Sequence, residues 1–111
     1  MDNLEKYGNI IEGILQQYAA LPYRYGDVNT FVIVSQDRKH FLLMDEGWQD
    51  DLRVYGVITH VELRQDKIWI QRDGIEDGIT SELLEAGISK DKIVLGFQSP
   101  EIRQYTEFAI N

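Results

Sequence analysis

The chain has 111 residues, 43% of them hydrophobic and 27% charged, and this suits one domain, residues 1–111, with a core of its own. It has no cysteine, which excludes disulfides and thiolate metal sites, and it shows neither a signal peptide nor an apolar run of the ~20 residues that a membrane span needs, so a cytoplasmic protein is expected. Its 19 acidic and 11 basic residues give a net charge of -8, and because phosphate backbones repel such a surface we expect no autonomous nucleic-acid binding.

Residues 3–20 are predicted to form an amphipathic helix. Apolar side chains recur at steps of three and four, which places them on one buried face. Asp2 or Asn3 can cap the first turn, and the segment 21–27, which contains Pro22 and Gly26, ends the helix. The apolar positions are Leu4, Tyr7, Ile10, Ile11, Ile14, Leu15 and Tyr18.

Two short apolar runs, 30–34 and 40–44, are separated by turn residues and predict a β-hairpin. With Asp37 and Arg38 at its tip, Val34 lies opposite Phe41. Both faces of this hairpin are then apolar, so each needs a cover. The helix can cover one face, and a later element or a second subunit must cover the other.

A third strand is expected over 53–63, followed by a turn centred on Gln65 and Asp66 and a fourth strand over 68–71. This register sets Val61 opposite Ile70, Leu63 opposite Ile68, Glu62 opposite Trp69 and His60 opposite Gln71. Strict alternation predicts one face with Tyr55, Val57, Thr59, Val61 and Leu63, and another with Val54, Gly56, Ile58, His60 and Glu62.

The remaining elements are short. A helix is predicted over 79–86 with Gly87 at its end, then an extended segment over 93–97. Ser99 and Pro100 favour a last helix over 100–106. The predicted fold class is α+β, with an N-terminal helix packed on a mainly antiparallel β-sheet and short helices near the C-terminus.

The sequence gives no reason to expect an enzyme, a metal site or a cofactor. His60 and Glu62 point to the same side of one strand, but a histidine in an interface or a hydrogen bond is the preferred explanation of this pair. Asp45 with Glu62 and Arg64 resembles the Asp…Glu-x-Lys pattern of metal-dependent nucleases, although arginine stands where lysine belongs. We therefore predict no catalytic, cofactor-binding or metal residues.

The aromatic residues favour protein binding, because tryptophan and tyrosine are enriched at interfaces. Trp69 shares its predicted face with His60, Glu62 and Gln71, and either an interface or a core position fits it. The acids that follow add charge that can steer a partner, or can merely solvate a turn. The candidate partner-binding residues are Trp69, His60, Glu62, Gln71, Asp73, Glu76 and Asp77.

The chain resembles the XisI family of element-excision controlling factors in the order and spacing of several motifs. They are Pro22-Tyr23 with Tyr25-Gly26-Asp27, Gly47-Trp48, Arg53-Val54-Tyr55-Gly56 running to His60, Lys67–Glu76, Ile93–Phe97, Ser99-Pro100 and Arg103–Ala109. The resemblance implies control of the excision of a DNA element that interrupts the fdxN gene, together with a XisH-like protein and a site-specific recombinase. The family offers no established catalytic residues to carry over.

The resemblance implies a cyanobacterial-type accessory protein that controls site-specific excision by binding a XisH-like protein, and the composition adds the expectation that it is cytoplasmic and not a catalyst. Because its hairpin is apolar on both faces, we also expect a homo-oligomer, at least a dimer. Two alternatives stay open: a metal-dependent nuclease that acts on DNA directly, and a homo-oligomeric structural module.

Overall fold

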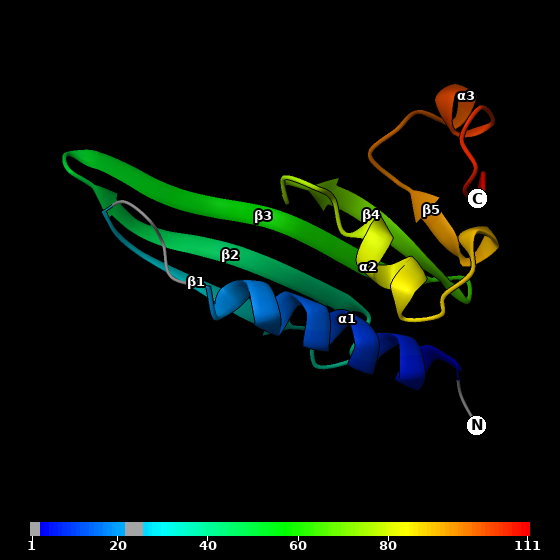
Figure 1. Cartoon of the computed structure of the whole chain (residues 1–111), viewed down its shortest axis with the longest axis horizontal. Coiled ribbons are helices and arrows are strands. Elements are labelled where there is room, and N and C mark those ends of the chain that lie inside the picture. Colours follow the sequence, from blue (N-terminus) through cyan, green and yellow to red (C-terminus); the bar gives the residue numbers. More distant parts are fainter. Residues whose placement is uncertain (1–2, 22–25) are drawn as a thin grey trace.

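The computed structural model describes residues 3–21 and 26–111, so the predicted cap Asp2 and the turn and family-motif residues 22–25 lie outside the described residues. The fold is α+β: an N-terminal helix, a five-stranded mixed sheet and short helices (Figure 1). In chain order the elements are α1 (Asn3–Ala19), β1 (Asp27–Val34), β2 (His40–Gln49), β3 (Leu52–Arg64), β4 (Lys67–Asp73), α2 (Thr80–Glu85), the 3-10 turn η1 (Lys90–Lys92), β5 (Ile93–Leu95) and α3 (Pro100–Arg103).

Helix α1 forms as its periodicity predicts. Ile11 and Leu15 are fully buried and pack on the sheet with Phe41 of β2. Gly8 lies on the same face, where an added Cβ would come within 3.2 Å of the Phe41 ring. The glycine that weakens the helix as an isolated segment therefore lets α1 approach the sheet closely.

The sheet has the strand order β1-β2-β3-β4-β5, antiparallel except for the parallel β4–β5 pair. The predicted pairs Val34–Phe41, Val61–Ile70 and Leu63–Ile68 are confirmed, as is Glu62–Trp69. Gln65 and Asp66 both have positive φ, 53° and 63°, which is the two-residue hairpin turn whose twist matches the strands. Strand β2 is longer than the apolar run 40–44 and continues to Gln49.

Two β-bulges correct the predicted alternation of β3 and β4. Between β2 and β3, Leu43 pairs with Thr59 but Met44 pairs with Val57, so Ile58 is an extra residue. Adjacent residues of β2 point to opposite faces, and Val57 therefore lies on the face opposite Thr59. Tyr55 moves with Val57, and Ile58 packs against the core instead.

The second bulge lies between β3 and β4. Val61 pairs with Ile70, but His60 pairs with Arg72, so the predicted pair of His60 with Gln71 is wrong. Gln71 is the inserted residue. An added Cβ at Gly96 would lie only 2.6 Å from its side-chain oxygen, so the missing side chain of Gly96 gives Gln71 its space.

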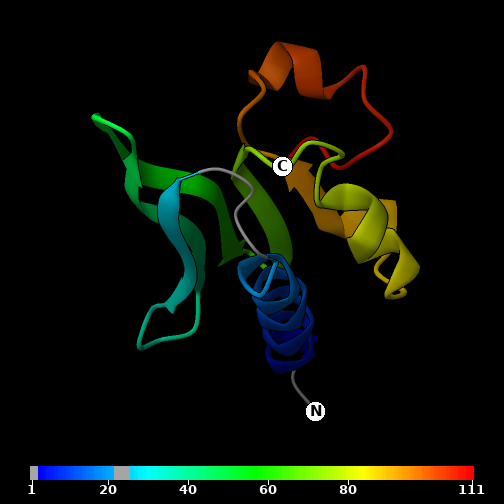
Figure 2. The ribbon, with the colours of Figure 1, turned by 60° about the vertical axis from the view of Figure 1, so that its left-hand side comes forward.

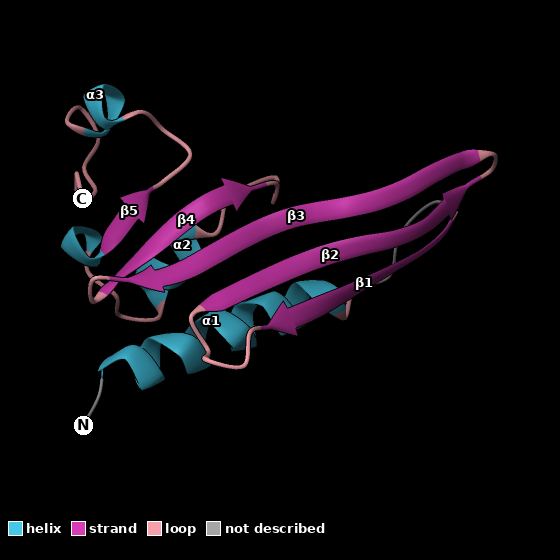
Figure 3. Ribbon diagram, turned by 180° about the vertical axis from the view of Figure 1, so that it is seen from behind, coloured by secondary structure: helices cyan, strands magenta, loops and turns pink. Residues whose placement is uncertain are grey.

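The two faces of the sheet are covered differently. Helices α1 and α2 lie on the same face, and Ile79 and Leu83 join the core cluster there (Figure 1). Seen from behind, strands β1 to β3 have no helix over them (Figure 3). We call the α1 side the covered face and the other side the open face. The open face carries Phe31, Ile33, His40, Leu42, Met44, Tyr55, Val57, His60 and Glu62.

The C-terminal segment borders β5 and lies away from α1 (Figure 2). Gly87, with φ of 95°, ends α2 as predicted, and the Ser99 hydroxyl accepts the cap hydrogen bond from the Ile102 N–H. Helix α3 is shorter than predicted, since it ends at Arg103 and not at 106. Ala109 then forms a parallel bridge with Val94. Among the described residues, no helix is both long and apolar enough to span a membrane.

Candidate functional site

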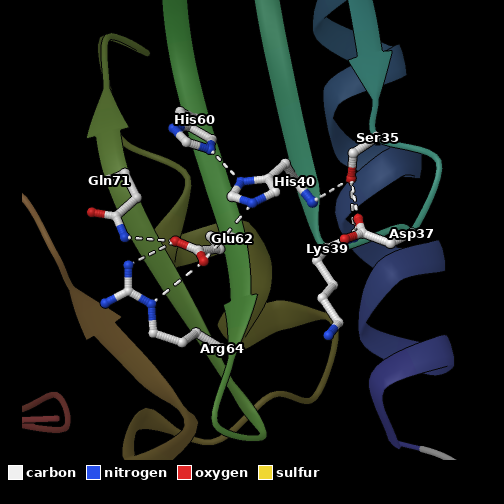
Figure 4. Close-up of polar contacts among 8 residues, drawn as sticks. All are labelled: Ser35, Asp37, Lys39, His40, His60, Glu62, Arg64 and Gln71. Carbon is white, nitrogen blue, oxygen red and sulfur yellow. Dashed lines mark hydrogen bonds and ion pairs between the residues drawn. The ribbon is translucent and has the colours of Figure 1, made fainter.

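A polar cluster lies on the open face where β2, β3 and β4 run side by side (Figure 4). His40 Nδ1 is 3.0 Å from His60 Nε2, and the two rings are tilted by 34°. His40 Nε2 lies 3.9 Å from a carboxylate oxygen of Glu62. Arg64 and Gln71 donate to Glu62 at 2.9 and 3.1 Å. We call these five residues, His40, His60, Glu62, Arg64 and Gln71, the His–Glu cluster.

The register explains why the cluster forms. His40 pairs with Glu62 across β2 and β3, and Leu42 pairs with His60, so His40 and His60 lie diagonally on one face. Ser35 holds the turn before β2, because its hydroxyl accepts a hydrogen bond from the His40 N–H at 3.0 Å (Figure 4). This hydrogen bond fixes the start of β2. The predicted neighbours His60, Glu62 and Gln71 are therefore brought together, and His40 and Arg64 join them.

The charges of the cluster are tuned by burial and by these contacts. Burial lowers the pKa of His60, and the neighbouring His40 lowers it further. For Glu62, burial alone would raise the pKa, but the hydrogen bonds from Arg64 and Gln71 outweigh it and the pKa is lowered. The geometry thus favours a neutral His60 beside an ionised Glu62.

Trp69 lies next to the cluster, and two cations lie over its ring. The Arg64 guanidinium is 4.5 Å from its ring centroid and that of Arg103 is 5.2 Å away. Arg103 is itself held by the backbone oxygens of Leu95 and Gln98. The Trp69 side chain is 6% exposed, and its indole N–H has no hydrogen-bond partner among the described residues. In the isolated chain, Trp69 is thus a packed residue beneath two arginines.

The three predicted acids lie apart from the His–Glu cluster: Asp73 is the last residue of β4, and Glu76 and Asp77 lie in the loop that follows it. Asp73 accepts hydrogen bonds from the N–H groups of Ile75 and Ile79, which orders this loop. Glu76 lines a shallow groove on the covered face together with Tyr18 and Asp45. Asp77 is exposed. The structure therefore divides the predicted residues into an open-face group and an acidic loop, and their role in partner binding stays a prediction.

Tyr18 connects α1 to α2, the helix that follows this loop. Its hydroxyl donates to Glu82 of α2, and this hydrogen bond, burial and the nearby charges of Glu82, Asp77 and Asp73 raise the pKa of Tyr18 to about 12. The bond joins the two helices of the covered face.

The residues of the nuclease alternative do not converge. Asp45 is two residues from Leu43 on β2 and therefore lies on the covered face, where it lines the groove. Its carboxylate accepts a hydrogen bond from the Thr30 hydroxyl at 2.7 Å. Glu62 lies on the open face. Within the ranges 3–21 and 26–111, no three His, Asp or Glu side chains are arranged to hold one metal ion.

Sequence reasoning missed the part that the arginines play at this site. The guanidinium of Arg103 lies over the Trp69 ring, although Arg103 is 34 positions further along the chain. No local sequence pattern indicates this contact. Arg64 sits at the end of a strand and next to a turn, where a charged residue is ordinary. The diagonal contact of His40 with His60 depends on how far β2 and β3 stay in register before the bulge.

Comparison with known proteins gives consistent matches. The family model described as XisI protein matches residues 1–110. A solved XisI-like protein from Anabaena variabilis ATCC 29413 is 32% identical, with 97% of this chain and 99% of that chain covered and a TM-score of 0.89. The fdxN element excision controlling factor XisI from the same organism is 34% identical, with coverage of 99% and 100% and a TM-score of 0.83. No curated protein matches.

Proposed function

The chain belongs to the XisI family, and on that basis we propose that it is an accessory protein that controls site-specific excision of a DNA element. The observation that carries this proposal is the match, over 99% of this chain, to a solved protein described as an fdxN element excision controlling factor. We further propose that the 111 residues act as one XisI-like domain in the cytoplasm.

The proposed mechanism is binding of a XisH-like protein, without catalysis by this chain. The His–Glu cluster supports binding over chemistry, because Glu62 is already held by hydrogen bonds from Arg64 and Gln71. The net charge of -8 disfavours a direct contact with DNA and favours a partner with a basic surface.

The open face supplies the proposed docking surface. His60, Glu62 and Gln71 offer hydrogen-bonding groups there, and Trp69 gives the surface a rigid base. Asp73, Glu76 and Asp77 lie elsewhere, but charge steers an approaching partner through space and does not need to touch it. The acidic loop then speeds the encounter, and the open face holds the complex.

Excision in the native host tests the proposal. A strain that lacks this gene should fail to excise the element, as detected by PCR across the new junction, and the wild-type gene should restore excision. A His60→Ala, Glu62→Ala double variant should restore it poorly, whereas Glu107→Ala, at an exposed ion pair with Lys90 remote from the cluster, should restore it fully. Normal excision in the deletion strain would rule out the function.

A biochemical arm separates binding from catalysis. The purified chain should neither shift nor nick DNA at about 100 mM salt, with or without magnesium or manganese. DNA binding needs a cluster of basic residues that contact phosphates, and the basic residues of this chain are scattered along its sequence. Sub-micromolar DNA binding or metal-dependent nicking by the chain would favour the nuclease alternative instead.

A further inference from the structure

The two edges of the sheet end differently. At the β5 edge, the Ala109 N–H donates to the Ile93 oxygen at 2.9 Å and the C-terminal segment borders the strand. At the other edge, β1 pairs with β2 on one side, and among the described residues no strand or bridge pairs with its other side. Antiparallel pairing uses the backbone groups of alternate residues, so half of the N–H and C=O groups of β1 point outward.

Strand β1 lacks the features that usually protect an edge. It pairs with β2 at eight consecutive positions without a bulge, and it contains no proline and no lysine. Residues 28–36 carry no charge. On the open face, Phe31 and Ile33 remain 38% and 43% exposed. An edge that is uncharged from Val28 to Val34 and largely apolar is a template for another strand.

We propose that two copies of this chain pair through β1, antiparallel and about a two-fold axis, so that the two five-stranded sheets become continuous. A register centred on Val32 sets Phe31 of one copy beside Ile33 of the second copy on the open face. Val32 then meets Val32 of the second copy on the covered face. Such apolar cross-strand pairs stabilise a sheet.

Self-complementarity identifies the second copy as the occupant, because the antiparallel register sets the uncharged stretch 28–36 against itself. Two chains of net charge -8 repel each other over most of their surface, but the neutral stretch 28–36 lets them approach without opposing like charges. A basic partner is instead drawn to the acids of the β4–α2 loop, on another part of the molecule. This pairing also leaves the His–Glu cluster free, so the inference does not depend on the proposed function.

Sedimentation equilibrium of the full chain tests the pairing. At about 50 µM the wild-type chain should be a dimer, and Ile33→Lys should weaken the dimer at least ~10-fold by placing a charge in the apolar pair. Tyr55→Lys is the matched control, because Tyr55 lies on the open face of β3, away from the edge, and is 67% exposed. The Tyr55→Lys dimer should have the same dissociation constant as the wild-type dimer.

Amide exchange of the wild-type chain gives a second readout that needs no variant. The outward-pointing amides of β1 should be protected at concentrations where the dimer forms and should exchange faster on dilution. A wild-type monomer at about 50 µM would overturn the proposal. Equal dissociation by Tyr55→Lys and Ile33→Lys would also overturn it, because it would indicate packing through the open face rather than through the edge.

Discussion

The covered face and the open face of the sheet are built from the same strands but carry different side chains. On the covered face, Phe41, Val61 and Ile70 are fully buried under α1 and α2. On the open face, the same strands contribute the His–Glu cluster and exposed aromatics such as Tyr55. The contrast indicates that the covered face holds the fold together, whereas the open face is available for binding.

The largest expected effect is on the free energy of unfolding, and it distinguishes the two faces. Phe41→Ala removes a fully buried ring and should lower the free energy of unfolding by about 3–5 kcal/mol. Tyr55→Ala, on the open face, should change it by about 0.5 kcal/mol or less. Urea unfolding followed by circular dichroism measures both, and similar losses for the two variants would remove the distinction.

A smaller effect concerns the bond between α1 and α2. Tyr18→Phe deletes the hydrogen bond to Glu82 and should cost about 1–2 kcal/mol. The raised pKa of about 12 means that the fold favours the neutral phenol, so its contribution is present below the ordinary value of 10.0 and is lost as the pH rises through 12. The stability difference between wild type and Tyr18→Phe should therefore shrink between pH 10 and 12. A difference that stays constant there would contradict this role.

The smallest expected effect lies on the open face. The pKa of His60 is lowered from 6.5 by burial and by His40, so the fold favours the neutral imidazole. Its contribution to stability is present above the ordinary pKa and is lost as the pH falls through the folded value. His60→Gln should therefore flatten the decline in unfolding free energy between about pH 7.5 and 5.5. An unchanged pH profile would show that His60 is not the group that titrates.

The covered face could be predicted from the sequence because its signals are local and regular. The helical spacing of Ile11 and Leu15 and the turn at Gln65-Asp66 each determined an element or a register. The predicted alternation of faces was wrong at Ile58 and Gln71, where each bulge adds one residue. Nothing in the local sequence indicates these bulges. Strict period-two reasoning therefore placed Tyr55 and Val57 on the wrong face.

The candidate site was only partly predictable. His60 and Glu62 lie two apart on one strand, so their common face follows from the strand period alone. Their contacts with His40 and Gln71 depend on how the bulges set neighbouring strands. Arg103 reaches the Trp69 ring from the C-terminal segment and is held there by hydrogen bonds to backbone oxygens, an arrangement that no sequence pattern specifies.

Titration calorimetry with the XisH-like protein of the same host tests most directly whether the open face binds a partner. We expect the wild-type chain and Glu107→Ala to bind equally, and the folded double variant His60→Ala, Glu62→Ala to bind at least ~10-fold more weakly. Absence of binding by the wild-type chain, or unchanged affinity of the double variant, would contradict this account.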